Sequence, residues 1–361
     1  ISDATLTANN SEALVIEGEN SITLTNCTFN DCQAYAQNGG GFRSTAVYTT
    51  VNNCSFTNTS GAQGGGIALS NSNAKKGEIY GCSFDRCTAT NQGGGIYSAA
   101  KEFVIGDCTY TDDENGEYTV HTTINNCTSS NEGGGVYQGR DVDGSSLSVT
   151  NATITGNQTR SNNKNGGGIW TNARTVTIDG STISNNTCTS QGGGVYAYSY
   201  TLLTITNSNI SNNTASKSGG GVWFDANSDA NRALQVLTVK GSTIDGNTSG
   251  ENGGGIYTQA NTVTIQDYTY PDGEAPTGTP ATGSYIEDDD GNITGRRSEI
   301  TNCTAFRGGG IYHDRNKSGS KLEIVNTSVT ACRATGTLGG GVRSNAYALT
   351  VTNSDISGNT A

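Results

Sequence analysis

The 361-residue sequence predicts an all-β fold, a single right-handed parallel β-helix over residues 1–361, on the basis of three observations. The triplet Gly-Gly-Gly recurs ten times, a short strand-like pattern occurs in eleven copies, and one aligned position in every copy is Asn, Gly or Asp. Repeats of this length build solenoids, in which each unit buries its apolar side against its neighbours.

The triplets define the length of the repeat. The commonest interval between them is 25 to 34 residues, and two longer intervals indicate insertions. They begin at Gly39, Gly64, Gly93, Gly133, Gly166, Gly192, Gly219, Gly253, Gly308 and Gly339.

An alternating apolar pattern accompanies each triplet, as in SITLTNCTFNDC and LLTITNSNISNN. Alternation over so few residues is typical of strands rather than helices. The aligned copies give three apolar columns, so we expect three short strands per coil, about eleven coils and a spacing of about 4.8 Å. Right-handed crossovers are nearly universal between parallel strands. The columns are Leu24, Val51, Ile79, Ile105, Val149, Ile178, Ile205, Val239, Ile265, Ile324 and Val351; Phe42, Ile67, Ile96, Val136, Ile169, Val195, Val222, Ile256, Ile311 and Val342; and Phe29, Phe56, Phe84, Ile124, Ile154, Ile183, Ile210, Ile244, Ile300, Val329 and Ile356.

Two features predict the corners of each coil. The position two residues after the first column is always Asn, Gly or Asp, from Asn26 to Asn353, and these residues tolerate a left-handed backbone. The glycine triplet predicts a second sharp corner, where the coils crowd and a Cβ has no room.

A further column predicts an amide ladder inside the solenoid, because each amide can donate to one neighbouring coil and accept from the other. It contains Asn157, Asn186, Asn213, Asn247 and Asn359, and Cys32, Cys87, Cys127, Cys303 and Cys332 take the same position elsewhere.

The pairing of GGG-[I/V/F] with [F/I]-x-x-N is similar to the GGA-[I/L/V] and F-x-x-N repeats of polymorphic outer-membrane proteins, and it resembles secreted β-helix adhesins more widely. The resemblance covers nearly the whole chain. It implies a β-helix and a surface-displayed adhesive or structural role. The chain departs from that family in having GGG for GGA and mostly Ile for Phe.

Two inserted loops, residues 111–123 and 271–299, explain the long intervals. The second contains Pro271, Pro276 and Pro280, which are excluded from the interior of a sheet, so it should be an external loop. Loops on one side of a solenoid often form its binding face.

The ten cysteines leave two interpretations open. Stacked coils bring Cα atoms within disulfide range, which allows the pairs Cys27–Cys54, Cys82–Cys108, Cys87–Cys127 and Cys303–Cys332 in an oxidising compartment. The alternative is a ladder of buried free thiols. His121 and His313 should lie at or beside loops, in solvent.

The position two residues after each triplet should face outward, and seven consecutive coils place an aromatic residue there. Such a ladder stabilises a sheet by ring stacking, binds carbohydrate, or contacts another protein. Its members are Tyr97, Tyr137, Trp170, Tyr196, Trp223, Tyr257 and Tyr312.

The expected direction of each side chain, inward or outward, also divides the Asn-x-Ser/Thr sequons into two groups. Asn157 and Asn247 belong to the inward ladder and should be inaccessible. The candidates for N-glycosylation are the sequons expected in solvent: Asn58, Asn126, Asn185, Asn212, Asn292, Asn302 and Asn316.

The loop EDDDGN places Asp288, Asp290 and Asn292 at alternate positions, which suits calcium, but a solvated loop is the preferred interpretation and no metal or cofactor is predicted. The net charge of −12 disfavours nucleic acid, and no apolar run approaches the ~20 residues of a transmembrane segment.

These features predict an extracellular, cell-surface solenoid with a structural or adhesive role, a subunit or segment of a fibre that self-associates end to end. A carbohydrate-binding adhesin domain is one alternative, and a polysaccharide lyase or hydrolase with a loop-borne site is another. Such an enzyme needs paired carboxylates or calcium-bound acids beside a basic residue. The regular repeat displays no such set, so we predict no catalytic residues.

Overall fold

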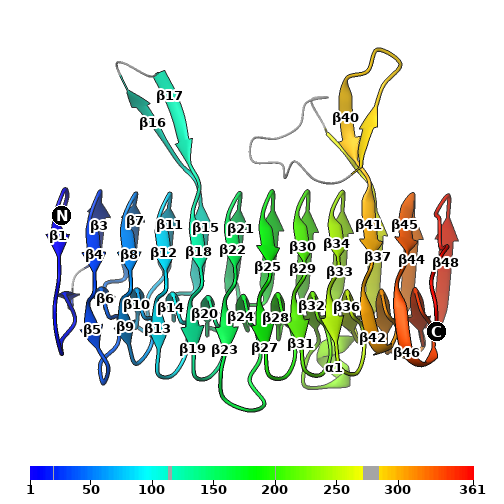
Figure 1. Ribbon diagram of the computed structural model, residues 1–361, viewed down its shortest axis with the longest axis horizontal. Coiled ribbons are helices and arrows are strands. Elements are labelled where there is room, and N and C mark those ends of the chain that lie inside the picture. Colours follow the sequence, from blue (N-terminus) through cyan, green and yellow to red (C-terminus); the bar gives the residue numbers. More distant parts are fainter. Residues whose placement is uncertain (19, 113–115, 200, 271–283) are drawn as a thin grey trace.

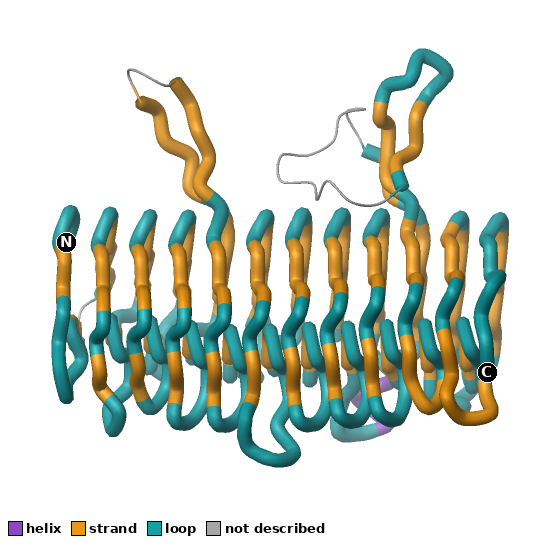
Figure 2. Tube along the Cα trace, viewed as in Figure 1, coloured by secondary structure: helices purple, strands orange, loops and turns teal. Residues whose placement is uncertain are grey.

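The computed structural model describes residues 1–18, 20–112, 116–199, 201–270 and 284–361. The chain winds into a straight stack of coils, and two arms project from one edge of the stack (Figures 1 and 2). Each coil passes in turn through four parallel sheets, which we name IV, I, II and III in the order of the chain. The predicted all-β parallel solenoid is confirmed.

Sheet I contains eleven five-residue strands, and the nine strands between the first and the last bury their second and fourth residues, as the alternating pattern predicts. Its fourth-position column is the predicted first apolar column, paired in register from Leu24 to Val351. The strands are β3 (Ser21–Thr25), β7 (Tyr48–Asn52), β11 (Lys76–Tyr80), β15 (Glu102–Gly106), β21 (Ser146–Thr150), β25 (Thr175–Asp179), β29 (Leu202–Thr206), β33 (Val236–Lys240), β37 (Thr262–Gln266), β44 (Lys321–Val325) and β48 (Ala348–Thr352).

Sheet II contains eleven shorter strands and carries the column that includes Phe29 and Ile154, which are fully buried. Phe29, Phe56 and Phe84 stack with ring centroids 4.6 and 4.9 Å apart. The strands are β1 (Thr5–Leu6), β4 (Thr28–Asn30), β8 (Ser55–Thr57), β12 (Ser83–Asp85), β18 (Thr123–Asn125), β22 (Thr153–Thr155), β26 (Thr182–Ser184), β30 (Asn209–Ser211), β34 (Thr243–Asp245), β41 (Ser298–Thr301) and β45 (Thr327–Thr330).

Sheet III corrects the expectation of three strands per coil, because every coil has a fourth. Most of its strands have two residues, and their inward positions are small residues such as Ala34, Gly61 and Ala89. No apolar column marks them in the sequence. The strands are β5 (Gln33–Ala34), β9 (Ser60–Gly61), β13 (Thr88–Ala89), β19 (Thr128–Ser129), β23 (Gln158–Thr159), β27 (Thr187–Cys188), β31 (Thr214–Ala215), β35 (Thr248–Ser249), β42 (Thr304–Arg307) and β46 (Arg333–Leu338).

Sheet IV follows the glycine triplets and carries the remaining predicted column, from Phe42 to Val342. The strands are β2 (Leu14–Ile16), β6 (Phe42–Ser44), β10 (Ile67–Leu69), β14 (Ile96–Ser98), β20 (Val136–Gln138), β24 (Ile169–Thr171), β28 (Val195–Ala197), β32 (Val222–Phe224), β36 (Ile256–Thr258), β43 (Ile311–His313) and β47 (Val342–Ser344).

A side chain is excluded at each glycine of a triplet, for a different steric reason at each position. Gly166 adopts a left-handed φ of +69°. A Cβ on Gly167 would lie 2.4 Å from the carbonyl oxygen of Gly193 on the next coil, and one on Gly168 would meet the Asn186 side chain at 3.0 Å. The triplet is therefore a crowded corner, as predicted, and not a loop that binds a ligand.

The Asn/Gly/Asp column forms the corner between sheets I and II. Nine of its eleven members have positive φ, for example Asn26 at 54° and Asn353 at 46°. Asp107 and Asp267 are the two exceptions, and both arms start at the residue that follows them. The chain leaves the coil at these two corners instead of turning.

The predicted amide ladder is present. Asn157, Asn186, Asn213 and Asn247 are fully buried, and each of the first three donates from Nδ2 to Oδ1 of the next at 3.0 Å. Asn359 lies in the same column and accepts the backbone N–H of Cys332.

Of the two interpretations of the cysteines, the structure has the free thiols, because all ten cysteines, which lie within the described residues, are unbridged. Side chains aligned in parallel strands leave in the same direction, so their Cβ atoms stay about as far apart as the coils, ~4.8 Å. A disulfide needs a Cβ separation of about 3.5–4.5 Å. The pairs Cys27–Cys54, Cys87–Cys127 and Cys303–Cys332 therefore remain stacked thiols.

Cys108 is also misplaced in the predicted cysteine column, because it begins the first arm. Thr122, where the chain re-enters the solenoid, occupies the column instead. The column is a ladder in which a backbone N–H donates to the side chain on the next coil. Examples are Cys27 to Sγ of Cys54 at 3.3 Å and Cys82 to Oγ1 of Thr122 at 3.2 Å.

Both histidines were expected in solvent. His121 is exposed, but His313 is fully buried in sheet IV, which corrects that expectation. The single helix of the described chain, α1 (Asp229–Arg232), has four residues. None of the described helical segments is long and apolar enough to cross a membrane.

Candidate functional site

Seven aromatic side chains on the outer side of sheet IV form a column along the solenoid axis, the aromatic stack, in which the first six rings stack face to face. The ring centroids of Tyr137 and Trp170 are 4.4 Å apart with their planes 8° from parallel, and those of Tyr196 and Trp223 are 4.3 Å apart at 9°. In-register pairing of the parallel strands places these rings above one another. The seventh ring, Tyr312, meets Tyr257 edge to face, with the planes 73° apart. The column contains all members of the predicted ladder: Tyr97, Tyr137, Trp170, Tyr196, Trp223, Tyr257 and Tyr312.

Four of the stacked rings are buried. Tyr196, Trp223, Tyr257 and Tyr312 are at most 8 % exposed, and burial raises the pKa of Tyr196. The guanidinium of Arg343 covers Tyr312 at 4.8 Å from the ring centroid. A sugar stacks on an open aromatic face. Tyr196, Trp223 and Tyr257 stack on neighbouring rings and Arg343 covers Tyr312, so these four rings offer no platform for a sugar.

The other three rings of the stack, Tyr97, Tyr137 and Trp170, are half-buried. Burial raises the pKa of Tyr97, and a hydrogen bond with Gln63 on the preceding coil opposes this shift. These rings present their edges to solvent beside the loops that precede the glycine triplets. This end of the stack is where a carbohydrate could still make contact.

A cluster of charged residues beside the stack was not predicted from the sequence. Both carboxylate oxygens of Asp225 accept from Arg232, at 2.6 and 3.1 Å. Burial raises the pKa of Asp225, and the hydrogen bonds from Arg232 act in the opposite direction. The sequence does indicate a long turn here. From the sheet IV column to the sheet I column the chain advances 17 residues between Val222 and Val239, but only ten between Val195 and Ile205 on the preceding coil.

The second carboxylate of this cluster belongs to Asp229 in α1. Its oxygens lie 3.6 Å from Arg315 and 3.1 Å from Lys317, two coils further along. Each acid of the cluster therefore faces cations. The arrangement fixes the long turn between β32 and β33, because both carboxylates pair with cations on either side of it.

The first arm is an antiparallel hairpin of β16 (Cys108–Asp112) and β17 (Gly116–Val120). Tyr110 and Tyr118 pack against each other across it, with ring centroids 5.6 Å apart. At its base, Nδ1 of His121 lies 2.8 Å from Oδ1 of Asp107, the last residue before the arm. The departure point is thus earlier than the predicted start at residue 111.

The second arm contains β38 (Tyr268–Thr269), β39 (Tyr285–Glu287) and β40 (Ile293–Arg296), which form a small antiparallel sheet. Its base is packed firmly against the solenoid. Arg296 is fully buried and donates from Nη2 to Oγ1 of Thr243 at 3.1 Å and to Asn209, while Tyr270 donates to Asn207 at 3.2 Å. The predicted loop around Pro271, Pro276 and Pro280 lies outside the described residues.

Glycines on the coil before each arm make room for it. A Cβ on Gly81 would lie 2.7 Å from Cβ of Cys108, and one on Gly241 would lie 2.6 Å from Cβ of Tyr268. Each arm therefore rests on the preceding corner. A glycine corner followed by an aspartate corner marks both insertions in the sequence.

Both arms project from the corner between sheets I and II, on one edge of the stack (Figure 1). Five coil steps separate β15 from β37, the strands that precede them, which corresponds to about 24 Å. Segments 108–121 and 268–297 contain ten acidic and two basic residues, so they hold −8 of the net charge of −12. The solenoid itself is close to neutral.

Hydrogen bonds to Asp288 organise the acidic turn of the second arm. The Asp288 carboxylate accepts the backbone N–H groups of Asp290 and Asn292, at 3.0 and 2.8 Å, and the amide of Asn292. These bonds lower the pKa of Asp288. Among the described residues, no group of three or more His, Cys, Asp or Glu is placed to hold a metal ion.

The candidate glycosylation residues all lie in solvent, whereas Asn157 and Asn247 are fully buried in the amide ladder. The exposed residues are Asn58, Asn126, Asn185, Asn212, Asn292, Asn302 and Asn316.

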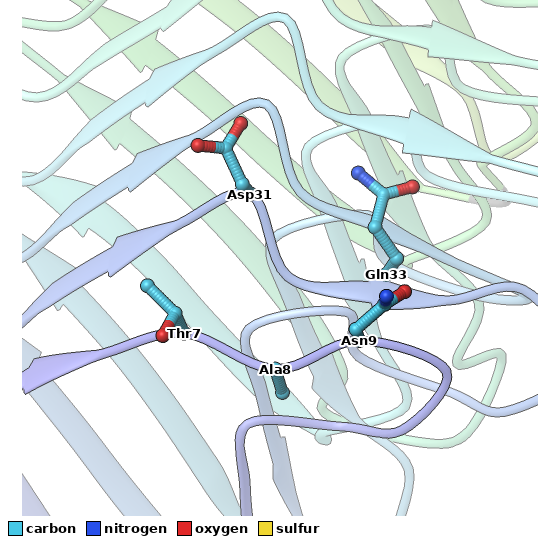
Figure 3. Close-up of a pocket in the computed structure, with 5 residues that line it drawn as sticks. All are labelled: Thr7, Ala8, Asn9, Asp31 and Gln33. Atoms are coloured by element: carbon cyan, nitrogen blue, oxygen red, sulfur yellow. The ribbon is translucent and has the colours of Figure 1, made fainter.

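An open depression of about 370 Å³ lies on the outermost coils (Figure 3). Its lining residues are Thr7, Ala8, Asn9, Asp31 and Gln33. The Gln33 amide is already engaged by Ser60 and by the carbonyl of Asn58. With one carboxylate and no basic group among the lining side chains, the depression does not provide an acid–base pair.

Comparison with family models places this geometry among known folds. Residues 1–122 and 113–270 match a model described as a right handed beta helix region. Comparison with curated proteins gave no match, and neither did comparison with solved structures.

Proposed function

Because the chain belongs to the right-handed β-helix family, we propose that it is an extracellular structural and adhesive solenoid, a subunit or segment of a surface fibre. The observation that carries this proposal is the pair of arms, which leave one edge of an otherwise regular stack about 24 Å apart. In this proposal the solenoid is a rigid spacer and the arms make the adhesive contacts.

The contacts at the base of each arm support this role. The His121–Asp107 contact holds the first arm, and the buried Arg296 and Tyr270 hold the second. Two contact elements at a fixed spacing on a stiff support bind a surface more tightly than either alone, because the second contact forms at high effective concentration. Both arms are acidic, so both should prefer a positively charged surface.

Self-association end to end is part of the proposal. Parallel strands with free edges pair with strands of another copy, and the in-register columns of the four sheets would continue across such a junction.

The test compares four proteins displayed on beads: the intact chain, the chain without residues 108–121, the chain without 268–297, and the chain without both. Retention under flow is measured on surfaces coated with polylysine, mannan or albumin. We expect retention on one of the first two coatings, weaker with one arm and lost without arms. Retention that never exceeds the value on albumin, or that is the same with and without the arms, would contradict the adhesive role.

A carbohydrate-binding surface is the second candidate, and the half-buried rings of Tyr97, Tyr137 and Trp170 favour it. Trp170→Ala should then reduce retention on mannan, whereas Trp223→Phe, at a buried ring of the same stack, should leave it unchanged. Equal retention by both variants would exclude this site.

A further inference from the structure

The corner between sheets II and III is built from a complete column of left-handed residues. Every member has a φ between +52° and +67°, and five members are the asparagines of sequons. The column is Asp31, Asn58, Arg86, Asn126, Gly156, Asn185, Asn212, Gly246, Asn302, Ala331 and Gly358.

All five asparagines are exposed at this corner. The hydroxyl residue of each sequon begins the next strand of sheet III, as Ser60 does after Asn58 and Thr128 after Asn126. Four sequons also lie at the corner between sheets I and II, but there Asn26 alone is exposed and the other three asparagines are half-buried.

The spacing of the five asparagines follows the coils. Asn58 and Asn126 are two coils apart, with Arg86 between them. In the same way Gly156 lies between Asn126 and Asn185, and Gly246 lies between Asn212 and Asn302. Two coils correspond to about 9.6 Å. Only Asn185 and Asn212 lie on adjacent coils, about 4.8 Å apart.

We propose that this corner is an N-glycosylated ridge. Asn58, Asn126 and Asn302 each carry a glycan, and on any one molecule only one of Asn185 and Asn212 does. A pyranose ring with its hydroxyls is wider than one coil step but fits within two. The proposal rests on the extracellular location proposed above and is independent of what the arms bind.

The modification is compatible with the fold at these positions. In the transfer, Nδ2 of the asparagine bonds to C1 of a lipid-linked sugar diphosphate, the C1–O bond to the diphosphate breaks, and one amide proton passes to a base of the transferase. The amide keeps its second N–H. The hydrogen bonds from Nδ2 of Asn302 to Asp245, at 2.7 Å, and of Asn126 to Asp85, at 3.3 Å, can therefore persist.

The same step at Asn157 or Asn247 is incompatible with folding. Their Nδ2 atoms donate to a backbone carbonyl of the preceding coil and to the next side chain of the column, inside the core. A chain modified there cannot close its coils. Folded, secreted protein should thus be unmodified at both positions, even though the transferase meets all the sequons on the unfolded chain.

The experiment uses the full chain secreted from a eukaryotic host. Enzymatic deglycosylation in ¹⁸O-water converts each modified asparagine to labelled aspartate, which mass spectrometry counts and places. Asn185 and Asn212 lie on one tryptic peptide, residues 175–217, because no Lys or Arg interrupts it before Lys217. We expect one label on this peptide, labels at Asn58, Asn126 and Asn302, and none at Asn157 or Asn247.

Two variants sharpen the test. Asn185→Gln removes one of the two competitors, so occupancy of Asn212 should rise toward completion. Arg86→Asn creates a sequon with Thr88 on the coil between Asn58 and Asn126, and the three neighbouring positions should then never carry three glycans on one molecule. Mostly doubly labelled peptide 175–217, or no label at Asn58, Asn126 and Asn302 in a host that glycosylates a control protein, would overturn the proposal. Neither result would bear on the arms.

Discussion

The amide of Asn157 donates from Nδ2 to Oδ1 of Asn186 on the next coil at 3.0 Å, and the same oxygen accepts the backbone N–H of Asn157 at 2.9 Å. One buried oxygen therefore satisfies two donors of the neighbouring coil. The relationship repeats from Asn186 to Asn213 and from Asn213 to Asn247. It joins the coils inside the core, where no water replaces a lost partner.

Asn186→Ala should destabilise the protein by roughly 2–5 kcal/mol, because it leaves two buried donors of Asn157 without an acceptor. Asn186→Cys is the matched control. In other coils a cysteine thiol of this column donates to the carbonyl that the amide would use, as Cys87 does to Phe56 at 3.4 Å. The control should lose less stability. Urea unfolding measures both, and equal losses would mean that the amide bonds contribute nothing beyond volume.

Gly167→Ala should cost about 3 kcal/mol or more, because the added Cβ would meet backbone atoms of the next coil at 2.4 Å, which cannot move independently. Gly319→Ala is the control, since that glycine has a φ of +85° and nothing within 4 Å. Its cost should be the ~1–2 kcal/mol of a left-handed backbone. Thermal unfolding of the two variants distinguishes crowding from backbone strain, and similar values would remove the crowding explanation.

His313 should make stability depend on pH. It is fully buried, with Nε2 2.8 Å from the carbonyl oxygen of Ala260, and burial lowers its pKa. Below about pH 6.5 the unfolded chain binds a proton that the folded chain excludes, so stability falls as the pH drops through that value, by up to ~1.4 kcal/mol per unit.

His313→Gln should remove this dependence and still fold. Gln138 occupies the same column and donates from Nε2 to the carbonyl of Ala100 on the preceding coil, as His313 does to Ala260. Urea unfolding at pH 7.5, 6 and 5 should show a steeper loss for the natural chain than for the variant. Parallel curves would assign the pH dependence to other groups.

Deletion of residues 108–121 should leave the solenoid folded. The cut joins Asp107 to Thr122, which already occupies the column of Cys82 and accepts its backbone N–H at 3.2 Å. Deletion of 268–297 joins Asp267 to Ser298, which likewise accepts the N–H of Ser242 at 3.3 Å. Each aspartate must then become left-handed, which Asp and Asn tolerate. Circular dichroism and the melting temperature should change little, and loss of cooperative unfolding would show that an arm is needed for folding.

The sequence predicts the stack of coils well because large apolar residues mark three strands in every coil and register is set by their alignment. It misses sheet III because small inward residues such as Ala34 and Gly61 give no contrast. The sequence leaves the choice between disulfides and free thiols open because the ~4.8 Å spacing satisfies the Cα limit of a disulfide, and only the directions of the side chains show that the Cβ limit is not met.

The sequence is less informative about the sites. It identifies the stacked aromatic residues, but the burial of Trp223 and Tyr257 depends on neighbouring coils and loops that only the folded chain brings together. The contact between Asp225 and Arg232 depends on a local turn with no counterpart in the other coils. The arms could have been placed more accurately, because Gly81 before Asp107 and Gly241 before Asp267 mark where each one leaves.

The proposed function depends on the claim that a stiff solenoid holds two arms on one edge at a fixed spacing, and electron microscopy of the purified protein can show whether it does. We expect straight rods with a repeat of about 4.8 Å and two projections on the same side about 24 Å apart, with end-to-end fibres that repeat this pair. Projections on opposite sides, at variable spacing, or lying flat on the rod would contradict the claim.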